Sequence, residues 1–360
     1  MDLEIVNILE KLEKNGFEAY LVGGFVRDYL LGINSLDIDI CTNALPKDII
    51  SIFNVKQDTV NYGSVSIQSG KYNFDITTYR KEFFYKNRRP DKIEYTNNLL
   101  IDVERRDFTI NALYMNKDGV VLDFLGGKED LNNKVIKCVG NTYEKLTEDP
   151  LRILRAIRFA VLLDFNLDNS ILDFITNHKD IIKTLSYTRK KEELDKIFSS
   201  KNVLKGLELL KKLDLLSVLE IEYDKIIEVP DLLGIWAQIN FSKDYPFTKN
   251  NLVIIERIRK IINNGEINNY ILFKNGLYIS LVAGEILGYD KKKLSEEYNI
   301  LPIKSISELK INNNDIMDIL NIEPNEKLKI IYEDIVKKVI NQNINNNFED
   351  IKKYILTNWK

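Results

Sequence analysis

The sequence predicts a mixed α/β head followed by an all-helical remainder. Within residues 1–140, short apolar segments of strand character alternate with segments whose apolar residues recur at helical spacing. After Glu148 the strand signals fade, and apolar residues recur every three or four positions through most of the remaining chain. At 360 residues the chain is also too long for one compact core, so two to four folding units are expected.

The head is expected to start with an amphipathic helix that ends near Gly16, where glycine can stop it. Short elements follow it, with strands over 19–22, 36–40, 64–68 and 72–78 and helices over 27–31 and 46–53. The stretch over 78–90 is polar, aromatic and basic, and no hydrophobic period runs through it. We therefore expect a mobile loop there.

Composition excludes several classes of function. Two cysteines are too few for a disulfide framework or a zinc cluster, and the single histidine, His178, lies in a polar helical stretch and is expected at the surface. Acid–base or metal chemistry must therefore come from carboxylates. We expect no membrane span and no signal peptide, because no apolar run is long enough and the N-terminal helix is acidic. A cytoplasmic protein is the natural expectation, and the net charge of −3 gives no global argument for nucleic-acid binding.

Two aspartates separated by one residue are the most informative feature of the chain. Residues i and i+2 of a strand point the same way, so Asp37 and Asp39 are expected on one face, with Leu36, Ile38 and Ile40 on the other. Like charges at that separation are tolerable mainly when a cation lies between them. Oxygen ligands without histidine or cysteine favour Mg²⁺ over zinc.

Neighbouring residues extend this candidate site toward phosphate. In Leu-Val-Gly-Gly-Phe-Val-Arg, Gly24 and the glycine before it allow a close approach of backbone to phosphate, and Arg27 can neutralise the charge. Asp75, in the middle of an expected strand, is a candidate third carboxylate, although a surface position on an edge strand fits it as well. Arg106, in Arg-Arg-Asp-Phe-Thr-Ile-Asn-Ala, is expected at the opening of an apolar helix, where it suits a triphosphate or ribose. Asp107 could cap that helix or hold an arginine.

A third cluster runs through Glu-Asp-Pro-Leu-Arg-Ile-Leu-Arg-Ala-Ile-Arg, from Glu148 to Arg158. At about 100° per residue, Arg152 lies about one turn from both Glu148 and Asp149. A paired carboxylate and guanidinium present acceptors and donors in one plane, which can mimic a base-pairing edge. Arg155 and Arg158 rotate progressively around the helix, so they cannot both share that face. Phosphate, RNA backbone or an internal carboxylate are their alternative partners.

These motifs together resemble the class II tRNA nucleotidyltransferases, the CCA-adding enzymes, which share their head with bacterial poly(A) polymerases. The likeness runs almost continuously over residues 17–160, through LVGGFVRDYLLG, DIDI, FDITTYRKEFFYKNRRPDKIEY, DVERRDFTINALYMN, DFLGGKEDL and EDPLRILRAIRF. It implies a nucleotidyltransferase head with a mixed sheet of the DNA polymerase β type. It also implies a catalytic head over 1–140, a nucleotide-reading neck over 141–200, a helical body over 201–300 and a tRNA-binding tail over 301–360.

The resemblance also implies roles for individual residues. Asp37 and Asp39 match the Mg²⁺-binding catalytic pair. Asp75 is not assigned by the resemblance, but as the third carboxylate of a two-metal site it is expected to help activate the attacking hydroxyl. Positions that match nucleotide contacts are Gly24, Arg27, Arg106, Glu148, Asp149, Arg152, Arg155 and Arg158. Among these, Asp149 and Arg152 match the pair that reads the base of CTP or ATP. One departure is Thr188, which stands where the family has Glu, whereas Arg189 and Glu193 are kept.

The implied reaction adds C, C and A to the 3′ end of tRNA from CTP and ATP, with release of pyrophosphate. The helical parts would hold the acceptor and T arms of the tRNA by shape and phosphate contacts, and no protein partner is implied. The sequence leaves open an A-adding or poly(A) polymerase-type enzyme that uses ATP only, although the 78–90 stretch resembles the loop of full CCA-adding enzymes. It also leaves open a non-catalytic RNA-binding protein built on the same head.

Overall fold

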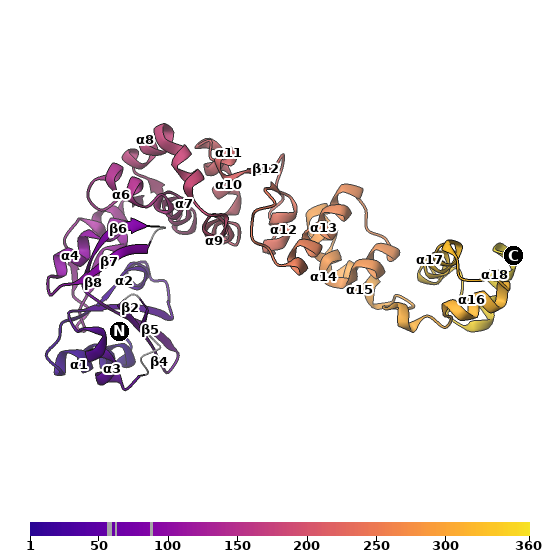
Figure 1. The fold of residues 1–360 in the computed structure, drawn as a ribbon, viewed down its shortest axis with the longest axis horizontal. Helices are drawn as coiled ribbons and strands as arrows, with labels where there is room; N and C mark the ends of the chain where they lie inside the picture. The colour runs from indigo at the N-terminus through magenta and orange to yellow at the C-terminus, as the bar shows by residue number, and fades with distance from the viewer. Residues whose placement is uncertain (56–59, 62, 87–88) are drawn as a thin grey trace. The chain divides into compact units, whose positions relative to one another are not determined.

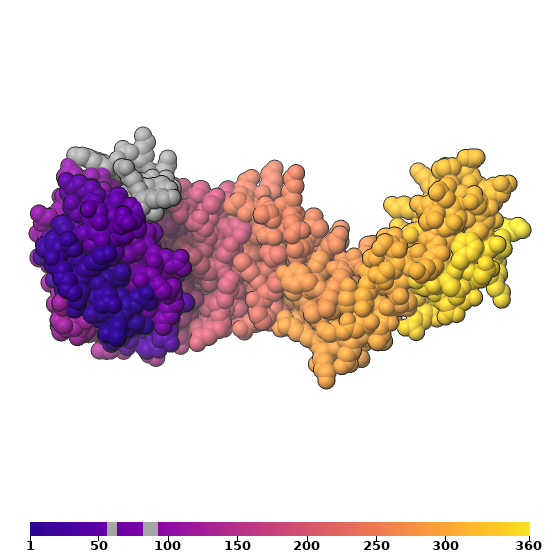
Figure 2. All heavy atoms as spheres, turned by 90° about the horizontal axis from the view of Figure 1, so that it is seen from below, coloured from indigo at the N-terminus to yellow at the C-terminus, as the bar shows by residue number. Residues whose placement is uncertain are grey.

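The computed structural model describes residues 1–55, 60–61, 63–86 and 89–360, and divides the chain into two compact units. Unit 1 comprises Met1–Glu220 and unit 2 comprises Ile221–Lys360. Figure 1 shows the strands of the large sheet in the first part of unit 1 and mainly helices from α6 onward. Figure 2 shows the N-terminal residues on the surface of unit 1, in indigo.

Unit 1 begins with the sheet-containing head and continues into helices. The strands of unit 1 are β1 (Ala19–Val22), β2 (Asp37–Thr42), β3 (Val60–Asn61), β4 (Ser64–Ser69), β5 (Tyr72–Thr78), β6 (Arg80–Lys86), β7 (Arg89–Tyr95), β8 (Leu113–Met115), β9 (Val121–Asp123), β10 (Val135–Ile136) and β11 (Asn166–Leu167). Its helices are α1 (Leu3–Lys14), α2 (Gly24–Leu30), α3 (Pro46–Phe53), α4 (Leu99–Glu104), α5 (Gly127–Asn132), α6 (Thr142–Glu148), α7 (Leu151–Leu163), α8 (Asn169–His178), α9 (Tyr187–Phe198), α10 (Val203–Lys212) and α11 (Leu216–Leu219), with 3₁₀ turns η2 (Thr109–Asn111) and η3 (Lys179–Thr184).

The large sheet is mixed, with strand order β3-β4-β5-β2-β1-β8-β9. The central pair β2 and β5 is parallel, and the other neighbours are antiparallel. β5 therefore lies inside the sheet, which removes the edge-strand alternative for Asp75. The predicted α/β head is confirmed, with a largely helical remainder.

The two faces of this sheet differ in how deeply their side chains are buried. Ile38 and Ile40 of β2 are almost completely buried, and they share a core with Phe74 of β5 and with Leu9 and Ile49 of helices α1 and α3. The alternate residues of β2 and β5 point to the opposite face, as the period of two requires. On this second face Asp37, Asp39 and Asp75 are exposed, whereas Cys41, farther along β2, is buried in a second apolar cluster with Tyr114.

Three local predictions were wrong. Leu36 is 54% exposed because β2 begins only at Asp37, so the alternation does not reach it. The 78–90 stretch, expected as a loop, contains β6 and the start of β7, which pair as an antiparallel hairpin. Aromatic residues in this stretch favour extended backbone. Asn87 and Arg88 lie outside the described residues. No apolar helix follows Arg106, because α4 ends before it and only the short turn η2 precedes strand β8.

Unit 2 consists mainly of helices. Its elements are β12 (Ile221–Glu222), α12 (Leu232–Ala237), β13 (Asn240–Phe241), α13 (Lys249–Asn264), α14 (Asn269–Leu287), α15 (Lys291–Asn299), the 3₁₀ turn η4 (Ile306–Glu308), α16 (Asn313–Leu320), α17 (Glu326–Ile340) and α18 (Phe348–Asn358). Contrary to expectation, one segment, α14, is long and apolar enough to cross a bilayer by length and composition. Its backbone is interrupted at Gly276, where φ is 76°, and it packs against α13 and α15.

Candidate functional site

Three carboxylates share the open face of the central strands. Asp37 and Asp39 are exposed and alternate with the buried Ile38 and Ile40, so both point to this face as predicted. In the parallel register Asp39 pairs with Asp75 of β5, which is exposed on the same face. Asn73 donates to Oδ1 of Asp37 at 3.2 Å, and the Ser66 hydroxyl donates to Asp75. The sheet therefore brings together the three acidic residues that the sequence singled out.

The charge of this cluster is poorly compensated. Although Asp39 is partly open to solvent, the protein around its carboxylate displaces water and so raises its pKa. Arg106 acts in the opposite direction, and the nearby carboxylates of Asp75 and Asp37 raise the pKa further. A divalent cation would relieve this repulsion. Among the described residues, no three Asp, Glu, His or Cys side chains gather closely enough to hold a metal by themselves. The donor set nevertheless fits Mg²⁺, which is commonly bound by one or two carboxylates with water and substrate phosphate completing the shell.

The glycine pair lies directly against the carboxylates. Gly23 has φ 71° and ψ −137°, a backbone conformation that essentially only glycine adopts. A Cβ atom at this position would lie 3.2 Å from Oδ2 of Asp39 and 3.7 Å from Nη1 of Arg106. The missing side chain at Gly23 therefore allows the start of α2 to approach both the acid and the arginine. Gly24, the first residue of α2, similarly lies close to the guanidinium of Arg27.

Arg106 is held beside the carboxylates by two groups. Its Nε donates to the Tyr114 hydroxyl at 2.7 Å and its Nη2 donates to Asp102 at 3.0 Å. Asp102 is completely buried, and it also accepts from Arg105 at 2.7 Å and from the Tyr114 hydroxyl at 3.0 Å. Burial favours the neutral form of Asp102, but the two guanidiniums outweigh it and lower its pKa. One edge of the Arg106 guanidinium is thus fixed, and its Nη1 points toward Gly23.

A chain of hydrogen bonds connects α2 with α7. Arg27 pairs with Asp28 and donates from Nη1 to Oδ1 of Asn111 at 2.8 Å, and Nδ2 of Asn111 donates to Asp107 at 3.2 Å. Asp107 accepts from Nε and Nη2 of Arg155 at 2.9 and 2.5 Å. It also accepts from the backbone N–H of Phe108. Asp107 thus holds an arginine in the structure, and Nε and Nη2 of Arg155 have this internal carboxylate as their partner.

The Glu148–Arg152 pair forms at a break between two helices. Pro150 directly precedes the first residue of α7, whereas Glu148 belongs to the end of α6 and Asp149 is extended between the two helices. Arg152 still donates from Nη1 to Glu148 at 2.7 Å and to the Lys145 carbonyl at 2.9 Å. Asp149 is partly exposed and its carboxylate accepts from the N–H of Leu151. The break directs Asp149 differently from a side chain inside a continuous helix.

Arg158 also has an internal partner. Its Nη1 donates to both carboxylate oxygens of Glu193 at 3.0 and 2.7 Å, and both side chains are buried. Burial lowers the pKa of Arg158, whereas the Glu193 charge opposes that effect. Glu193 lies on α9, and Thr188 of the same helix is exposed. The Thr188 departure therefore leaves the Arg158–Glu193 pair intact.

Sequence reasoning missed the residues that support these arginines. Asp102 and Tyr114 hold Arg106, and Asn111 joins Arg27 to Asp107. The spacing of Asp102 three and four residues before Arg105 and Arg106 is a signal that could have found it. Nothing comparable marks Tyr114 or Asn111, whose roles depend on tertiary contacts. His178 is exposed, as predicted.

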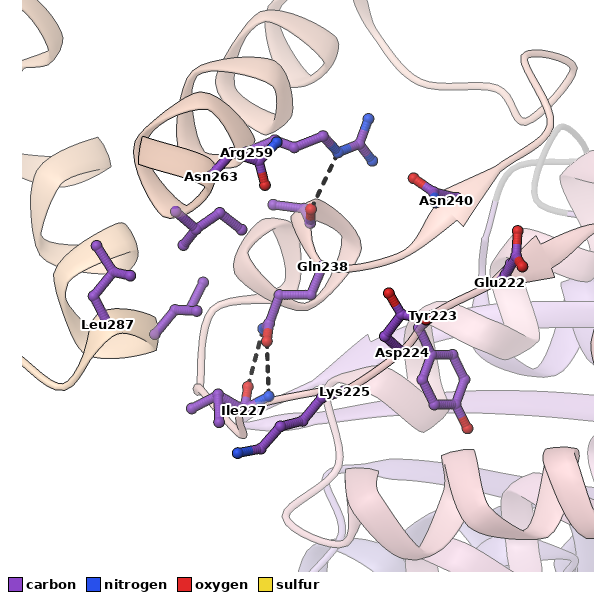
Figure 3. Close-up of a pocket in the computed structure, with 13 residues that line it drawn as sticks. Glu222, Tyr223, Asp224, Lys225, Ile227, Gln238, Asn240, Arg259, Asn263 and Leu287 are labelled. Atoms are coloured by element: carbon purple, nitrogen blue, oxygen red, sulfur yellow. Dashed lines mark hydrogen bonds between the residues drawn. The ribbon is translucent and has the colours of Figure 1, made fainter. Parts of the chain in front are cut away.

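Unit 2 contains a cavity of about 500 Å³ that includes none of the residues predicted from sequence. Figure 3 shows it between the β12–α12 loop and the ends of α13 and α14, with Gln238 and Arg259 among its lining residues. Gln238 is bonded to the backbone of Ile227, and Arg259 donates to the carbonyls of Ala237 and Ile239. Because these polar groups already have backbone partners, they hold the unit together, and the cavity is separate from the carboxylate site.

The fold and the carboxylate site define a nucleotidyltransferase. The family model of the poly(A) polymerase head domain matches residues 19–137, which include both strands that carry the acids. A model described as a probable RNA- and SrmB-binding site of polymerase A matches 164–225, and one of tRNA nucleotidyltransferase domain 2 matches 237–355.

Comparison with single proteins specifies the family. A CCA-adding enzyme of Ligilactobacillus salivarius is 33% identical, and the alignment covers 95% of this chain and 93% of that protein. The chain therefore belongs to the CCA-adding enzyme family. The crystal structure of the Bacillus stearothermophilus CCA-adding enzyme in complex with CTP has a TM-score of 0.87 at 25% identity, over 99% of this chain and 96% of that one. The Thermotoga maritima CCA-adding enzyme complexed with tRNA shares the fold, with a TM-score of 0.67 at 22% identity over 100% and 97% of the chains.

Proposed function

We propose that this protein is a CCA tRNA nucleotidyltransferase, which adds C, C and A to the 3′ end of tRNA from CTP and ATP. The observation that carries the proposal is the shared face of Asp37, Asp39 and Asp75, beside glycines and a fixed arginine, in a chain of the CCA-adding enzyme family. Relatives of this family are named for CCA addition, and one similar structure holds CTP.

The carboxylate face supports phosphoryl transfer. Asp37 and Asp39 would hold Mg²⁺, and when bound the ion would neutralise phosphate charge and lower the pKa of the attacking hydroxyl. Asp75, next to Asp39 in the sheet, would take the proton of the tRNA 3′-hydroxyl. The oxygen of that hydroxyl bonds to the α-phosphorus of the nucleotide, and the bond from that phosphorus to pyrophosphate breaks. Nη1 of Arg106, aimed at Gly23 and Asp39, would stabilise the negative charge of the triphosphate.

The α6–α7 junction would read the base. Arg152 is fixed by Glu148 and the Lys145 carbonyl, and Asp149 lies beside it at the start of α7. A carboxylate and a guanidinium held next to each other would present hydrogen-bond acceptors and donors to the hydrogen-bonding edge of cytosine or adenine. Gly24, Arg27, Arg155 and Arg158 would complete the nucleotide contacts.

The remaining assignments concern RNA and location. We propose that the neck over 141–200, the body over 201–300 and the tail over 301–360 bind the acceptor and T arms of tRNA through shape and phosphate. We also place the protein in the cytoplasm, where the reduced, buried thiols of Cys41 and Cys138 are stable.

A primer-extension assay tests this function. The protein is incubated with tRNA lacking its CCA end and Mg²⁺, together with CTP, ATP or both, and product length is read on a gel. The proposal predicts two added residues with CTP alone and three with both nucleotides. Extension with ATP only would indicate an A-adding or poly(A) polymerase-type enzyme, and binding without extension would indicate a non-catalytic RNA-binding protein.

A further inference from the structure

One aromatic ring lies among three of the arginines that were assigned to the nucleotide. The guanidinium carbons of Arg158, Arg27 and Arg155 lie 4.4, 5.0 and 5.6 Å from the centroid of the Phe159 ring. All three distances are within the range of cation–π attraction. Phe159 is itself only 8% exposed, and the ring of Phe108 meets it edge-on at 5.8 Å.

These three arginines come from different parts of unit 1. Arg27 belongs to α2 of the head, while the other two belong to α7. Each arginine also has a carboxylate partner of its own. Arg27 pairs with Asp28 of α2, Arg155 with Asp107, which precedes η2, and Arg158 with Glu193 of α9. The carboxylates orient each guanidinium separately, whereas all three guanidiniums contact the ring of Phe159.

The three guanidinium groups repel one another, so a contact that attracts all of them stabilises their arrangement. The charges of Arg155 and Arg27 both act to lower the pKa of Arg158, after the larger effect of burial. The electron-rich face of an aromatic ring attracts each guanidinium without adding a charge or needing hydrogen bonds. It can therefore hold several cations near one another before an anionic ligand arrives.

We propose that Phe159 is a positioning residue for nucleotide binding, whose ring holds the three arginines where they meet the incoming triphosphate. This inference rests on the proposed function, because it assigns those arginines to the nucleotide. Since the triphosphate is common to both substrates, Phe159 affects CTP and ATP equally. It does not contribute to the choice between them, which belongs to Asp149 and Arg152.

Stepwise fluorination of the ring tests the proposal in the full-length protein. Replacing Phe159 with phenylalanines that carry one, two or three fluorines weakens cation–π attraction while largely keeping ring shape and packing. The expected result is a graded rise of KM for both nucleotides, reaching about tenfold with three fluorines, with kcat within about twofold. Dissociation constants for CTP and ATP, measured by equilibrium dialysis without tRNA, should rise in parallel.

The controls separate this inference from the function itself. Phe174 is another buried ring of unit 1, packed against Tyr143 and His178, and its trifluoro replacement should leave both nucleotide constants unchanged. Phe159→Leu, which removes the ring, should weaken nucleotide binding at least as much as three fluorines. Constants that stay flat across the Phe159 series, in a protein that still extends tRNA, would overturn the inference alone. A wild-type protein that extends no tRNA would overturn the proposed function.

Discussion

The Asp107→Asn variant tests the connection between the head and helix α7 most quantitatively. Burial alone would raise the pKa of Asp107, but Arg155 and hydrogen bonds from Asn111 and the Phe108 N–H outweigh it and lower the pKa from 3.8 to about 2. A pKa difference of one between the folded and unfolded states corresponds to about 1.4 kcal/mol, so the carboxylate contributes about 2 kcal/mol to the free energy of unfolding at pH 7. The variant should lose about that amount.

The pH dependence of the loss follows from the direction in which the pKa moves. A carboxyl whose pKa is lower in the folded state stabilises the protein above its unfolded pKa, and the contribution disappears as pH falls toward the folded pKa. The difference between wild type and Asp107→Asn should therefore be constant from pH 7 to 5 and fall to about 1 kcal/mol near pH 3.

Urea unfolding followed by two probes measures this loss. Both tryptophans, Trp236 and Trp359, lie in unit 2, so their fluorescence reports on that unit, while far-UV circular dichroism reports on both. The Asp107→Asn loss should appear in the dichroism transition. Arg155→Met removes the hydrogen bonds to Asp107 by changing the donor residue. The double variant should therefore lose less unfolding free energy than the sum of the two single variants. Two results would refute the Asp107–Arg155 pair. One is a loss of unfolding free energy below about 0.5 kcal/mol in Asp107→Asn, where about 2 kcal/mol is expected. The other is a double variant whose loss equals the sum of the losses of the single variants.

Three further variants test the site itself. Gly23→Ala adds a Cβ 3.2 Å from Oδ2 of Asp39 in a backbone conformation that costs about 1–3 kcal/mol for a residue other than glycine, so kcat should fall at least tenfold, as single-turnover incorporation would measure. Tyr114→Phe removes the 2.7 Å bond to Arg106, and KM for both nucleotides should rise about threefold to tenfold in steady-state kinetics, whereas an unchanged KM would exclude this role. Arg152→Ala should reduce discrimination between CTP and ATP in competition assays, and retained selectivity would contradict base reading. The thermal unfolding midpoint is measured in parallel, because the variant also removes a buried guanidinium that is bonded to Glu148 and to the Lys145 carbonyl.

The sequence predicted the features of this site that depend on neighbouring residues, and it missed those that depend on contacts between residues far apart in the chain. Asp37 and Asp39 were placed correctly on one face because the period of a strand is a local property. The pairing of Asp39 with Asp75 needed the parallel β2–β5 register, which no local pattern specifies. The helix expected after Arg106 was wrong. Its apolar residues Phe108, Ile110 and Ala112 are completely buried around a short 3₁₀ turn, so the apolar content there reflects tertiary packing.

The partners of the arginines show the same limit. Helical geometry predicted that Arg155 and Arg158 cannot both share the base-reading face. It could not identify their partners, because Asp107 and Glu193 are 48 and 35 residues away in sequence. Only the packing of α7 against α9 and against the segment before η2 brings these carboxylates within reach. The ring of Phe159 acquires its neighbour Arg27 in the same way, through tertiary packing.

The central claim is that the paired carboxylates of β2 bind divalent ions beneath a nucleoside triphosphate, and nucleotide incorporation by Asp39→Asn tests it most directly. Labelled CTP is supplied with truncated tRNA across a Mg²⁺ titration, and tRNA affinity is measured in the same samples. The account predicts that incorporation falls by at least a thousandfold at every Mg²⁺ concentration while tRNA affinity stays within about twofold, since phosphoryl transfer without metal loses several kcal/mol of charge stabilisation. Turnover equal to that of the wild type would contradict it.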